Sequence, residues 1–315
     1  CPRTAANEAA LGRAGREKTG PQLFVTTVFH VGTGLPWDVR RGTGTASERS
    51  HLLEMLGALP AGALLLADAG FTGYDLMAAV AAGGGGGAGR HFLIRAGANV
   101  RLLRGLGWCC DARDGVVCLW PDKAQKTRKR PPLVLRQVTL TDGRNRRMHL
   151  LTDVLDPAAL PDADAAALYA RRWTAEVLFR SLKQTMGRRT MVCGNPAHAG
   201  AELDWAVVGP WALGLMAADA VAAAGDPPAR VSVARALTAV RRAIGAAPAW
   251  VHRRVTLAAA LAAAVRDGYV RTRPKGARVP VDKKRDRPPG DPVARTATPA
   301  EVALAAELKE KLRAA

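Results

Sequence analysis

A short apolar run that ends in a carboxylate is the feature that most constrains this chain. Ala63–Ala67 has the sequence ALLLA and is followed at once by Asp68, Ala69 and Gly70. A run of this length that ends in a turn is typical of a buried strand, with the Asp side chain presented at the end of the strand. Ser47 can cap a helix before it, and Tyr74–Ala82 predicts a helix after it. The chain is therefore predicted to have an α/β fold.

Further strands are expected on both sides of this run. Gln22–His30 is rich in β-branched and aromatic residues, and Leu35–Arg40 follows it after a glycine-containing turn. Phe92–Arg95 predicts another strand. Between about residues 102 and 153 short candidate strands alternate with polar turns, which indicates a β-rich insertion, and its basic stretch Lys123–Arg130 predicts an exposed loop. The candidate strands are Val116–Trp120, Leu133–Thr139 and Met148–Leu151.

The second half of the chain is mainly helical in pattern. Asp162–Met186 predicts one long helix, and Ala-rich helical segments follow it up to about residue 267. Basic residues and prolines from Arg271 to Arg287 predict a loosely attached tail, which Pro299–Ala314 closes with a short helix. Four regions result: the first part of the core, a β-rich insertion, a helical part of the core, and the tail, at residues 1–98, 99–157, 158–268 and 269–315.

The charge of the chain indicates a polyanionic partner. Its 46 Lys and Arg residues exceed its 27 Asp and Glu residues, which gives a net charge of +19, and nucleic acid is the commonest partner for such an excess. Five cysteines without a CxxC pair indicate neither a disulfide framework nor a zinc site. The longest apolar stretch, Trp205–Ala224, is interrupted by Gly, Pro and Asp, so we expect no membrane span.

A stripe of functional side chains runs along the predicted helix Asp162–Met186. At 100° per residue, Tyr169, Arg172, Glu176 and Lys183 fall within about 60° of one another, beside an apolar face. A carboxylate on a rigid helix can hold a divalent metal, and the other three side chains can hold DNA phosphates. The alternative is an ordinary amphipathic helix with surface ion pairs.

The spacing Y-x2-R-x3-E-x6-K formed by these residues resembles the signature of the insertion-sequence transposases called family four. That family is a branch of the DDE class with a ribonuclease-H-like core. Three further segments resemble parts of the same family, and the likeness extends over roughly residues 5–190; the segments are Leu64–Leu76, Phe92–Asn99 and His149–Pro157.

The resemblance implies a DNA transposase that cleaves and transfers DNA strands at transposon ends. Asp68 matches the second and Glu176 the third of three catalytic carboxylates, which together would bind two Mg²⁺ or Mn²⁺ ions. The implied partners are the terminal inverted repeats and target DNA, with a homodimer bridging two DNA ends. The implied location is the bacterial cytoplasm, at the nucleoid.

The resemblance also implies DNA contacts. Tyr169, Arg172 and Lys183 match the signature residues that contact the transposon end. Trp173 beside them either packs against DNA or is a partly buried core tryptophan. In the family a tryptophan of the insertion can stack on an extruded base, and the candidates here are Trp108 and Trp120.

The implied fold is a ribonuclease-H-like mixed sheet with flanking helices, interrupted by the β-rich insertion and lacking its first core strand. The family's first catalytic Asp lies on that strand. The only Asp before Asp68 is Asp38, and its Pro-Trp-Asp context does not match. We therefore expect an N-terminally truncated transposase that is inactive by itself. The alternatives are a non-catalytic basic DNA-binding protein and another ribonuclease-H-like nuclease.

Overall fold

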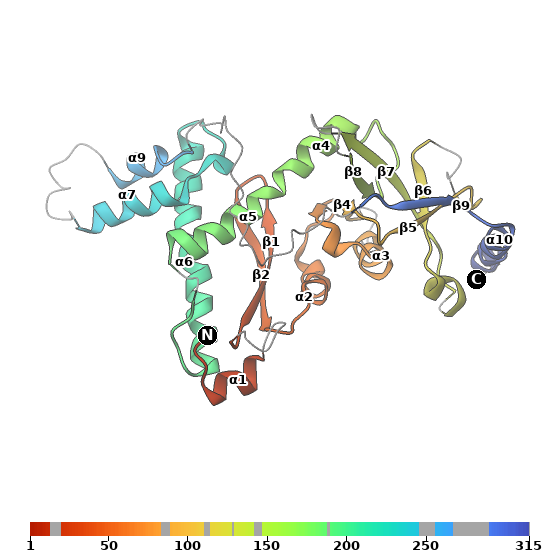
Figure 1. The fold of residues 1–315 in the computed structure, drawn as a ribbon. Helices are drawn as coiled ribbons and strands as arrows, with labels where there is room; N and C mark the ends of the chain where they lie inside the picture. Colours follow the sequence, from red (N-terminus) through yellow and green to blue (C-terminus); the bar gives the residue numbers. More distant parts are fainter. Residues whose placement is uncertain are drawn as a thin grey trace. The chain divides into compact units, whose positions relative to one another are not determined.

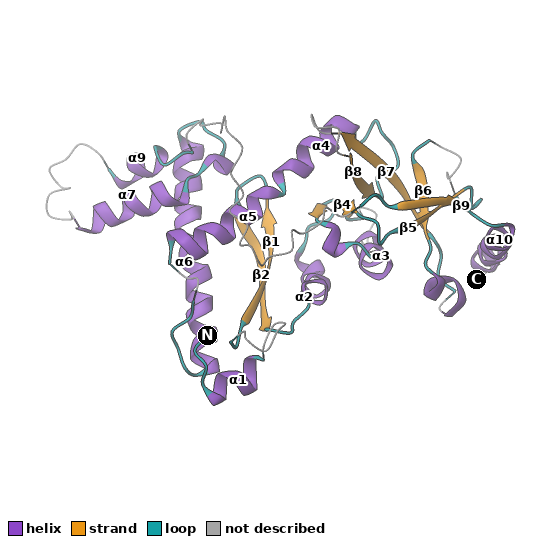
Figure 2. Ribbon diagram, in the orientation of Figure 1, coloured by secondary structure: helices purple, strands orange, loops and turns teal. Residues whose placement is uncertain are grey.

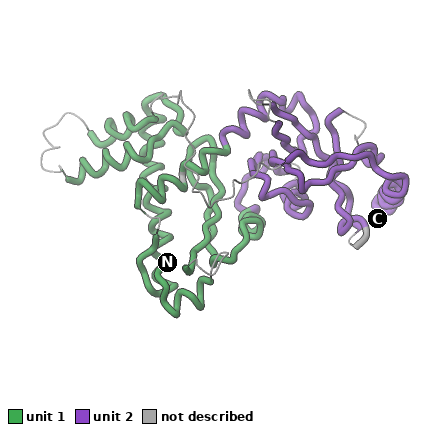
Figure 3. Tube along the Cα trace, viewed as in Figure 1, with its two compact units in different colours: residues 1–55, 172–276 green, residues 56–171, 277–315 purple. Residues whose placement is uncertain are grey.

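The protein consists of two compact units, and each is assembled from two separate stretches of the chain (Figure 3). Unit 1 comprises residues 1–55 and 172–276, and unit 2 comprises residues 56–171 and 277–315. The computed structural model describes residues 1–12, 20–82, 89–109, 114–127, 129–141, 147–187, 190–245, 256–266 and 290–314. The basic stretch Arg271–Arg287 of the predicted tail lies outside these residues.

A mixed seven-stranded sheet forms the centre of unit 2 (Figures 1 and 2). The strand order is β3-β4-β8-β7-β6-β5-β9. The outer pairs β3–β4 and β5–β9 are parallel, and the other neighbours are antiparallel. The mixed α/β fold expected from the sequence is thereby confirmed. The strands are β3 (Leu64–Ala67), β4 (His91–Ala96), β5 (Arg101–Arg104), β6 (Val116–Leu119), β7 (Leu133–Thr141), β8 (Arg147–Thr152) and β9 (Val293–Thr296).

Strand β4 lies in the core of unit 2 and is covered on both faces. Leu93 packs with Val138 of β7, Leu150 of β8 and helix α4 (Asp162–Arg171) in one buried cluster. Its neighbours Phe92 and Ile94 are also fully buried, and alternation along a strand points them to the opposite face. Helix α3 (Tyr74–Ala82) packs against β4. The sequence of β4 is nearly continuously apolar because both faces of the strand are buried.

The end of the chain is bound to this sheet. Strand β9 adds in parallel to β5, and the backbone of Ala297 donates a hydrogen bond to Arg104. Asp291 contacts His149 of β8, with 3.1 Å between the carboxylate and Nε2. The predicted helix Pro299–Ala314 is confirmed as α10, but the prediction of a loosely attached tail is wrong for residues 293–314. The sequence Val-Ala-Arg-Thr shows no apolar run because β9 is an exposed edge strand whose partner is distant in sequence.

A capping box fixes the start of α10. The Thr298 hydroxyl accepts from the Glu301 backbone, and the Glu301 carboxylate accepts from the Thr298 backbone at 2.8 Å. Two guanidinium nitrogens of Arg295 in β9 donate hydrogen bonds to the same carboxylate, at 2.6 and 2.8 Å. The hydrogen bond from Arg295, assisted by those from Thr298, lowers the pKa of Glu301 from 4.5 to about 2.

Glu301→Ala should lower the free energy of unfolding by about 1 kcal/mol at pH 7, because it removes this cap. Since the pKa is depressed in the folded state, the carboxylate stabilises fully above its ordinary pKa, and its contribution is lost as pH falls from about 4.5 through about 2. The difference in free energy of unfolding between variant and wild type, measured by denaturant unfolding, should become smaller as the pH falls over that range. Glu310→Ala on the exposed face of the same helix is the control, and an equal loss in both variants would count against the cap.

Unit 1 combines a two-stranded hairpin with helices (Figure 1). Strands β1 and β2 are antiparallel, and α2 packs against them with His51 Nδ1 hydrogen-bonded to the Thr26 hydroxyl at 2.9 Å. Helices α6, α7 and α9 bury a cluster that includes Leu213, Val221 and Leu261. The elements are α1 (Ala5–Leu11), β1 (Leu23–His30), β2 (Leu35–Thr43), α2 (Glu48–Met55), α5 (Trp173–Arg180), α6 (Pro196–Ala223), α7 (Val233–Gly245) and α9 (Leu257–Ala262).

Helix α6 is the longest helix described and continues through Pro210. By length and composition alone it could cross a membrane, although 39% of its most apolar window is buried inside the protein. The core helix of a globular unit meets the same criteria, and α6 packs against α7 and α9.

Two local predictions are wrong. The long helix Asp162–Met186 is three pieces: α4 ends at Arg171, α5 begins at Trp173, and a π-helical turn η4 (Ser181–Thr185) follows. The break after α4 is a tight turn in which the Ala175 backbone nitrogen donates to the Arg172 carbonyl, three residues earlier. In η4 the Met186 backbone nitrogen donates to the Ser181 carbonyl, five residues earlier, which is the π-helical pattern.

The predicted exposed loop Lys123–Arg130 begins instead with the π-helical turn η3, because Gln125 is buried and donates to the Trp120 carbonyl. The remaining short turns are η1, η2, η3 and η5, at Leu56–Ala58, Ala69–Phe71, Lys123–Thr127 and Pro228–Arg230.

Candidate active site

Asp68 directly follows β3, and its side chain is exposed. Its Oδ1 accepts a hydrogen bond of 2.8 Å from the backbone of Gly70 and caps the turn η2. A Cβ at position 70 would come within 2.9 Å of that oxygen, so the glycine lets the carboxylate fold over the turn. The Thr72 hydroxyl donates to the Arg95 carbonyl at 2.9 Å, which fixes the turn to the end of β4. The carboxylate is thus presented to solvent on a well-supported strand end.

The other predicted carboxylate, Glu176, lies on α5 in unit 1. Its Oε1 is 3.3 Å from Nη2 of Arg172, and both residues are partly exposed. An exposed i,i+4 pair of this kind contributes under about 1 kcal/mol, so Arg172 can exchange this carboxylate for another anion at little cost. Lys183 of η4 stands with its ammonium 5.9 Å from the centre of the Phe179 ring. Unit 1 therefore brings Arg172 and Glu176 together, while Asp68 belongs to unit 2.

The two aromatic residues of the predicted stripe differ in exposure. Tyr169 is only 6% exposed and packs in the core of unit 2 with Leu93 and Leu150, so it does not lie on a solvent-facing stripe. The tight turn after Arg171 ends the constant rotation per residue on which the predicted stripe depended. Trp173 is 60% exposed, which excludes the interpretation of a core tryptophan.

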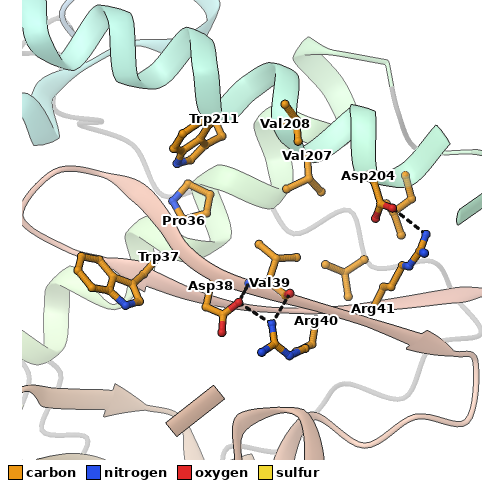
Figure 4. A pocket seen from close by; sticks show the side chains of 12 residues that line it. Pro36, Trp37, Asp38, Val39, Arg40, Arg41, Asp204, Val207, Val208 and Trp211 are labelled. Atoms are coloured by element: carbon orange, nitrogen blue, oxygen red, sulfur yellow. Dashed lines mark hydrogen bonds and ion pairs between the residues drawn. The ribbon is translucent and has the colours of Figure 1, made fainter. Parts of the chain in front are cut away.

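A groove in unit 1 lies between β2 and α6 (Figure 4). Its volume is about 500 Å³, its floor is apolar, and Trp37 and Trp211 stand at one end. At the other end Arg41 is paired with Asp204 at 2.9 Å. Between the two ends, along β2, Arg40 is paired with Asp38 at 2.6 Å. The cations of the groove are thus balanced by carboxylates, and none of the predicted site residues lines it. No sequence motif marks this groove, because it joins segments that are far apart in the chain.

Glycines explain how α6 approaches β2 so closely. A Cβ at Gly200 would meet the Arg41 guanidinium at 2.3 Å, and one at Gly214 would meet Leu35 at 2.7 Å. The two glycines are about 21 Å apart along the helix at 1.5 Å per residue. Leu35 and Arg41 are about 20 Å apart along the strand, so the helix follows β2 over this whole length. The one Asp of the first 67 residues, Asp38, is part of this contact region.

Comparison with known proteins decides the family. Residues 13–206, more than half of the chain, match the family described as transposase DDE domain. The chain belongs to that family. The matched region of this transposase-family chain contains both Asp68 and Glu176.

A curated relative agrees with this assignment. The protein is 30% identical over 196 residues to the transposase InsG for insertion sequence element IS4 of Escherichia coli K12. That alignment covers 59% of this chain and 42% of the relative, so the chain spans less than half of the relative's length. No solved structure matches.

DDE transposases generally use divalent metal ions. The question for this family member is whether its acidic residues can bind such ions. Asp68 and Glu176 supply the hard oxygen atoms that Mg²⁺ prefers. Among the residues that the structure describes, however, no three His, Cys, Asp or Glu side chains gather where they could hold a metal. Two carboxylates, one of them paired with Arg172, do not by themselves make up a complete two-metal site.

The two candidate base-stacking tryptophans of this family member also differ. Trp120 is 3% exposed, and its indole nitrogen donates to the Arg130 carbonyl at 2.8 Å. A ring enclosed in this way offers no face for a base. Trp108 is only half-buried, and its carbonyl accepts from Lys309 of α10 at 2.7 Å.

Proposed function

We propose that this chain is part of the catalytic core of an insertion-sequence transposase of family four. In the proposed function it binds the terminal inverted repeats and target DNA, and it contributes Asp68 and Glu176 to strand cleavage and transfer. The observation that carries the proposal is the family match over residues 13–206, which contains one exposed carboxylate at a strand end and another beside Arg172. The proposed assembly on DNA is a homodimer, and the proposed location is the bacterial nucleoid.

The proposed architecture is ribonuclease-H-like. The parallel pair β3–β4, with Asp68 after β3 and α3 between the two strands in sequence, supports it. In this interpretation the hairpin β1–β2 corresponds to the second and third core strands, and residues 99–157 are the insertion. The division at residues 98, 157 and 268 remains part of the same proposal.

Contacts to the DNA end are assigned to Arg172, Lys183 and Trp173. Arg172 and Trp173 are adjacent at the start of α5, and the exposed indole can cover a sugar or base while the guanidinium binds a phosphate. Tyr169 would need its hydroxyl to leave the core of unit 2 before it could contact DNA. Trp108 is the better candidate for stacking on an extruded base, since Trp120 is enclosed.

Cleavage by this chain alone is not expected. When bound, Mg²⁺ or Mn²⁺ would activate the attacking oxygen and stabilise the leaving one. A complete set of ligands needs a third acidic residue, and the one Asp that precedes Asp68 is held by Arg40 at 2.6 Å in the groove of unit 1. This observation favours a second candidate function for the chain as it stands, which is DNA binding without cleavage.

Binding and nicking assays of the full chain test the proposal. The fluorescence anisotropy of a labelled duplex with the inverted repeats that flank the coding region should report tighter binding than a scrambled duplex does. Arg172→Ala/Lys183→Ala should remove that preference. Arg101→Ala/Arg104→Ala, at the two exposed ends of β5, is the control with equal charge loss. Failure of the wild-type chain to bind either duplex would overturn the proposal. In a version of the chain to which a third acidic residue has been supplied, Mg²⁺-dependent nicking that survives Asp68→Ala and Glu176→Ala would overturn the assignment of the two carboxylates.

A further inference from the structure

A stretch of forty residues carries only positive charge. Residues 227–266 contain seven arginines but no Lys, Asp or Glu. Arginine has a planar fork of donors that matches phosphate oxygens in pairs, which lysine lacks. The structure describes five of these arginines: Arg230, Arg235, Arg241, Arg242 and Arg266.

Helix α7 displays three of them on one side. Its buried residues Ala236 and Ala239 belong to the apolar cluster that α7 forms with α6 and α9. At 100° per residue, Arg235, Arg241 and Arg242 fall within about 120° of one another, away from the centre of that apolar face. All three residues are exposed. The helix is therefore fixed by its alanines, and its three arginines are exposed.

Backbone hydrogen bonds place Arg266 beside the start of this helix. The Arg266 nitrogen donates to the Arg230 carbonyl, and Ser232 donates to Ala264, both at 2.7 Å. The Arg235 guanidinium donates to the Val265 carbonyl at 2.9 Å. Two segments separated by about thirty residues thus meet in one corner. We call Arg235, Arg241, Arg242 and Arg266 the arginine face.

The arginine face adjoins the segment that carries Arg172 and Glu176. The turn η4, which continues α5, contacts α7, and Met186 after it packs against the cluster of α6, α7 and α9. Partial desolvation, and next the neighbouring Arg180 of α5, lower the pKa of Arg266. Two guanidinium groups that repel each other in this way are both stabilised when an anion binds between or beside them.

We propose that the arginine face binds the phosphates of duplex DNA, as a second contact beside α5 and η4. The inference rests on the proposed function, because it takes DNA as the partner, but the residues are different from those of the signature. Arg235 and Arg242 lie about 10.5 Å apart along α7. This distance corresponds to about three steps of the charge spacing of 3.4 Å per DNA strand. Phosphate contacts of this kind position the duplex without reading its sequence.

Salt dependence of DNA binding is the test, with the full chain and a labelled scrambled duplex. Arg241→Ala/Arg242→Ala should weaken binding severalfold at low salt. It should also reduce the slope of log K against log salt by about 1.8, since each phosphate contact contributes about 0.9. Both side chains are exposed, so the thermal midpoint should not change. Arg241→Lys/Arg242→Lys should keep most of the slope because the charge is retained.

Two comparisons separate this inference from the proposed function. Arg101→Ala/Arg104→Ala removes the same charge from β5 of unit 2, and an equal loss of slope there would overturn the inference as a general charge effect. Arg172→Ala/Lys183→Ala reports on the signature residues. If that variant loses its preference for inverted repeats while Arg241→Ala/Arg242→Ala binds as wild type does, the arginine face is refuted and the proposed function stands.

Discussion

Asp68→Asn and Glu176→Gln should each reduce Mg²⁺-dependent nicking about a thousandfold or more in a version of this chain that cleaves DNA. A thousandfold loss corresponds to about 4 kcal/mol of transition-state stabilisation. The reason is that each substitution keeps the shape of the side chain but removes a charge that a two-metal site requires. The protein to be tested is a chimera in which a segment placed ahead of residue 1 supplies a third acidic residue. Plasmids carrying the flanking inverted repeats are the substrate.

Both substitutions spare the fold. An Asn at position 68 can still accept from the Gly70 backbone, and a Gln at 176 gives up only an exposed pair with Arg172. Asp164→Asn, an exposed acid in the first turn of α4, is the matched control and should cleave as the chimera does. If Glu176→Gln retains more than a tenth of the nicking rate while Asp164→Asn is unaffected, Glu176 is not a catalytic residue.

Leu150→Ala should lower the free energy of unfolding by about 3–5 kcal/mol, which is a large part of the stability of an ordinary domain. Leu150 is fully buried in β8, between β4 and β7, and contributes to the cluster with Leu93, Val138 and Tyr169. Removing three carbon atoms there leaves a cavity that sheet neighbours on both sides prevent from collapsing. Guanidinium unfolding followed by far-UV circular dichroism should show the transition of unit 2 at much lower denaturant.

The control is the same substitution on the surface. Leu312 of α10 is exposed and belongs to the same unit, so Leu312→Ala should change the free energy of unfolding by less than about 0.5 kcal/mol. Similar midpoints for Leu150→Ala and Leu312→Ala would mean that the cluster is not the core of unit 2. The slope of the transition should be the same in both variants, since the surface exposed on unfolding barely changes.

Local patterns in the sequence were sufficient for several elements. The run ALLLA predicts β3 and the exposed Asp68 after it, and Pro299–Ala314 coincides with α10. Gln22–His30 predicts β1 to within one residue. In each case the information lies within the element itself, either as an apolar run bounded by a turn or as a helical period with a cap.

Elements that depend on distant partners could not be predicted in the same way. Strand β9 exists because β5 offers it hydrogen bonds across nearly two hundred positions, and its own sequence is that of an exposed segment. Tyr169 is buried because residues of β4, β7 and β8 pack against α4. A helical projection of the sequence cannot show this packing, since the strands lie elsewhere in the chain. The arginines of α7 enter the sequence analysis only as part of the net charge, and the corner that joins Arg235 to Val265 appears only in the folded chain.

The interleaving of the two units has a practical consequence for protein dissection. Each unit is assembled from a piece of each half of the chain, so expression of residues 1–171 or 172–315 yields two fragments and neither unit. Closing β5 against β9 also requires a loop of nearly two hundred residues, whose entropic cost grows only slowly with its length. Isolated study of unit 2 therefore calls for co-expression of residues 56–171 with residues 290–314, or for a circular permutant that makes them contiguous. A C-terminal truncation would leave β5 as a bare edge and favour association between copies.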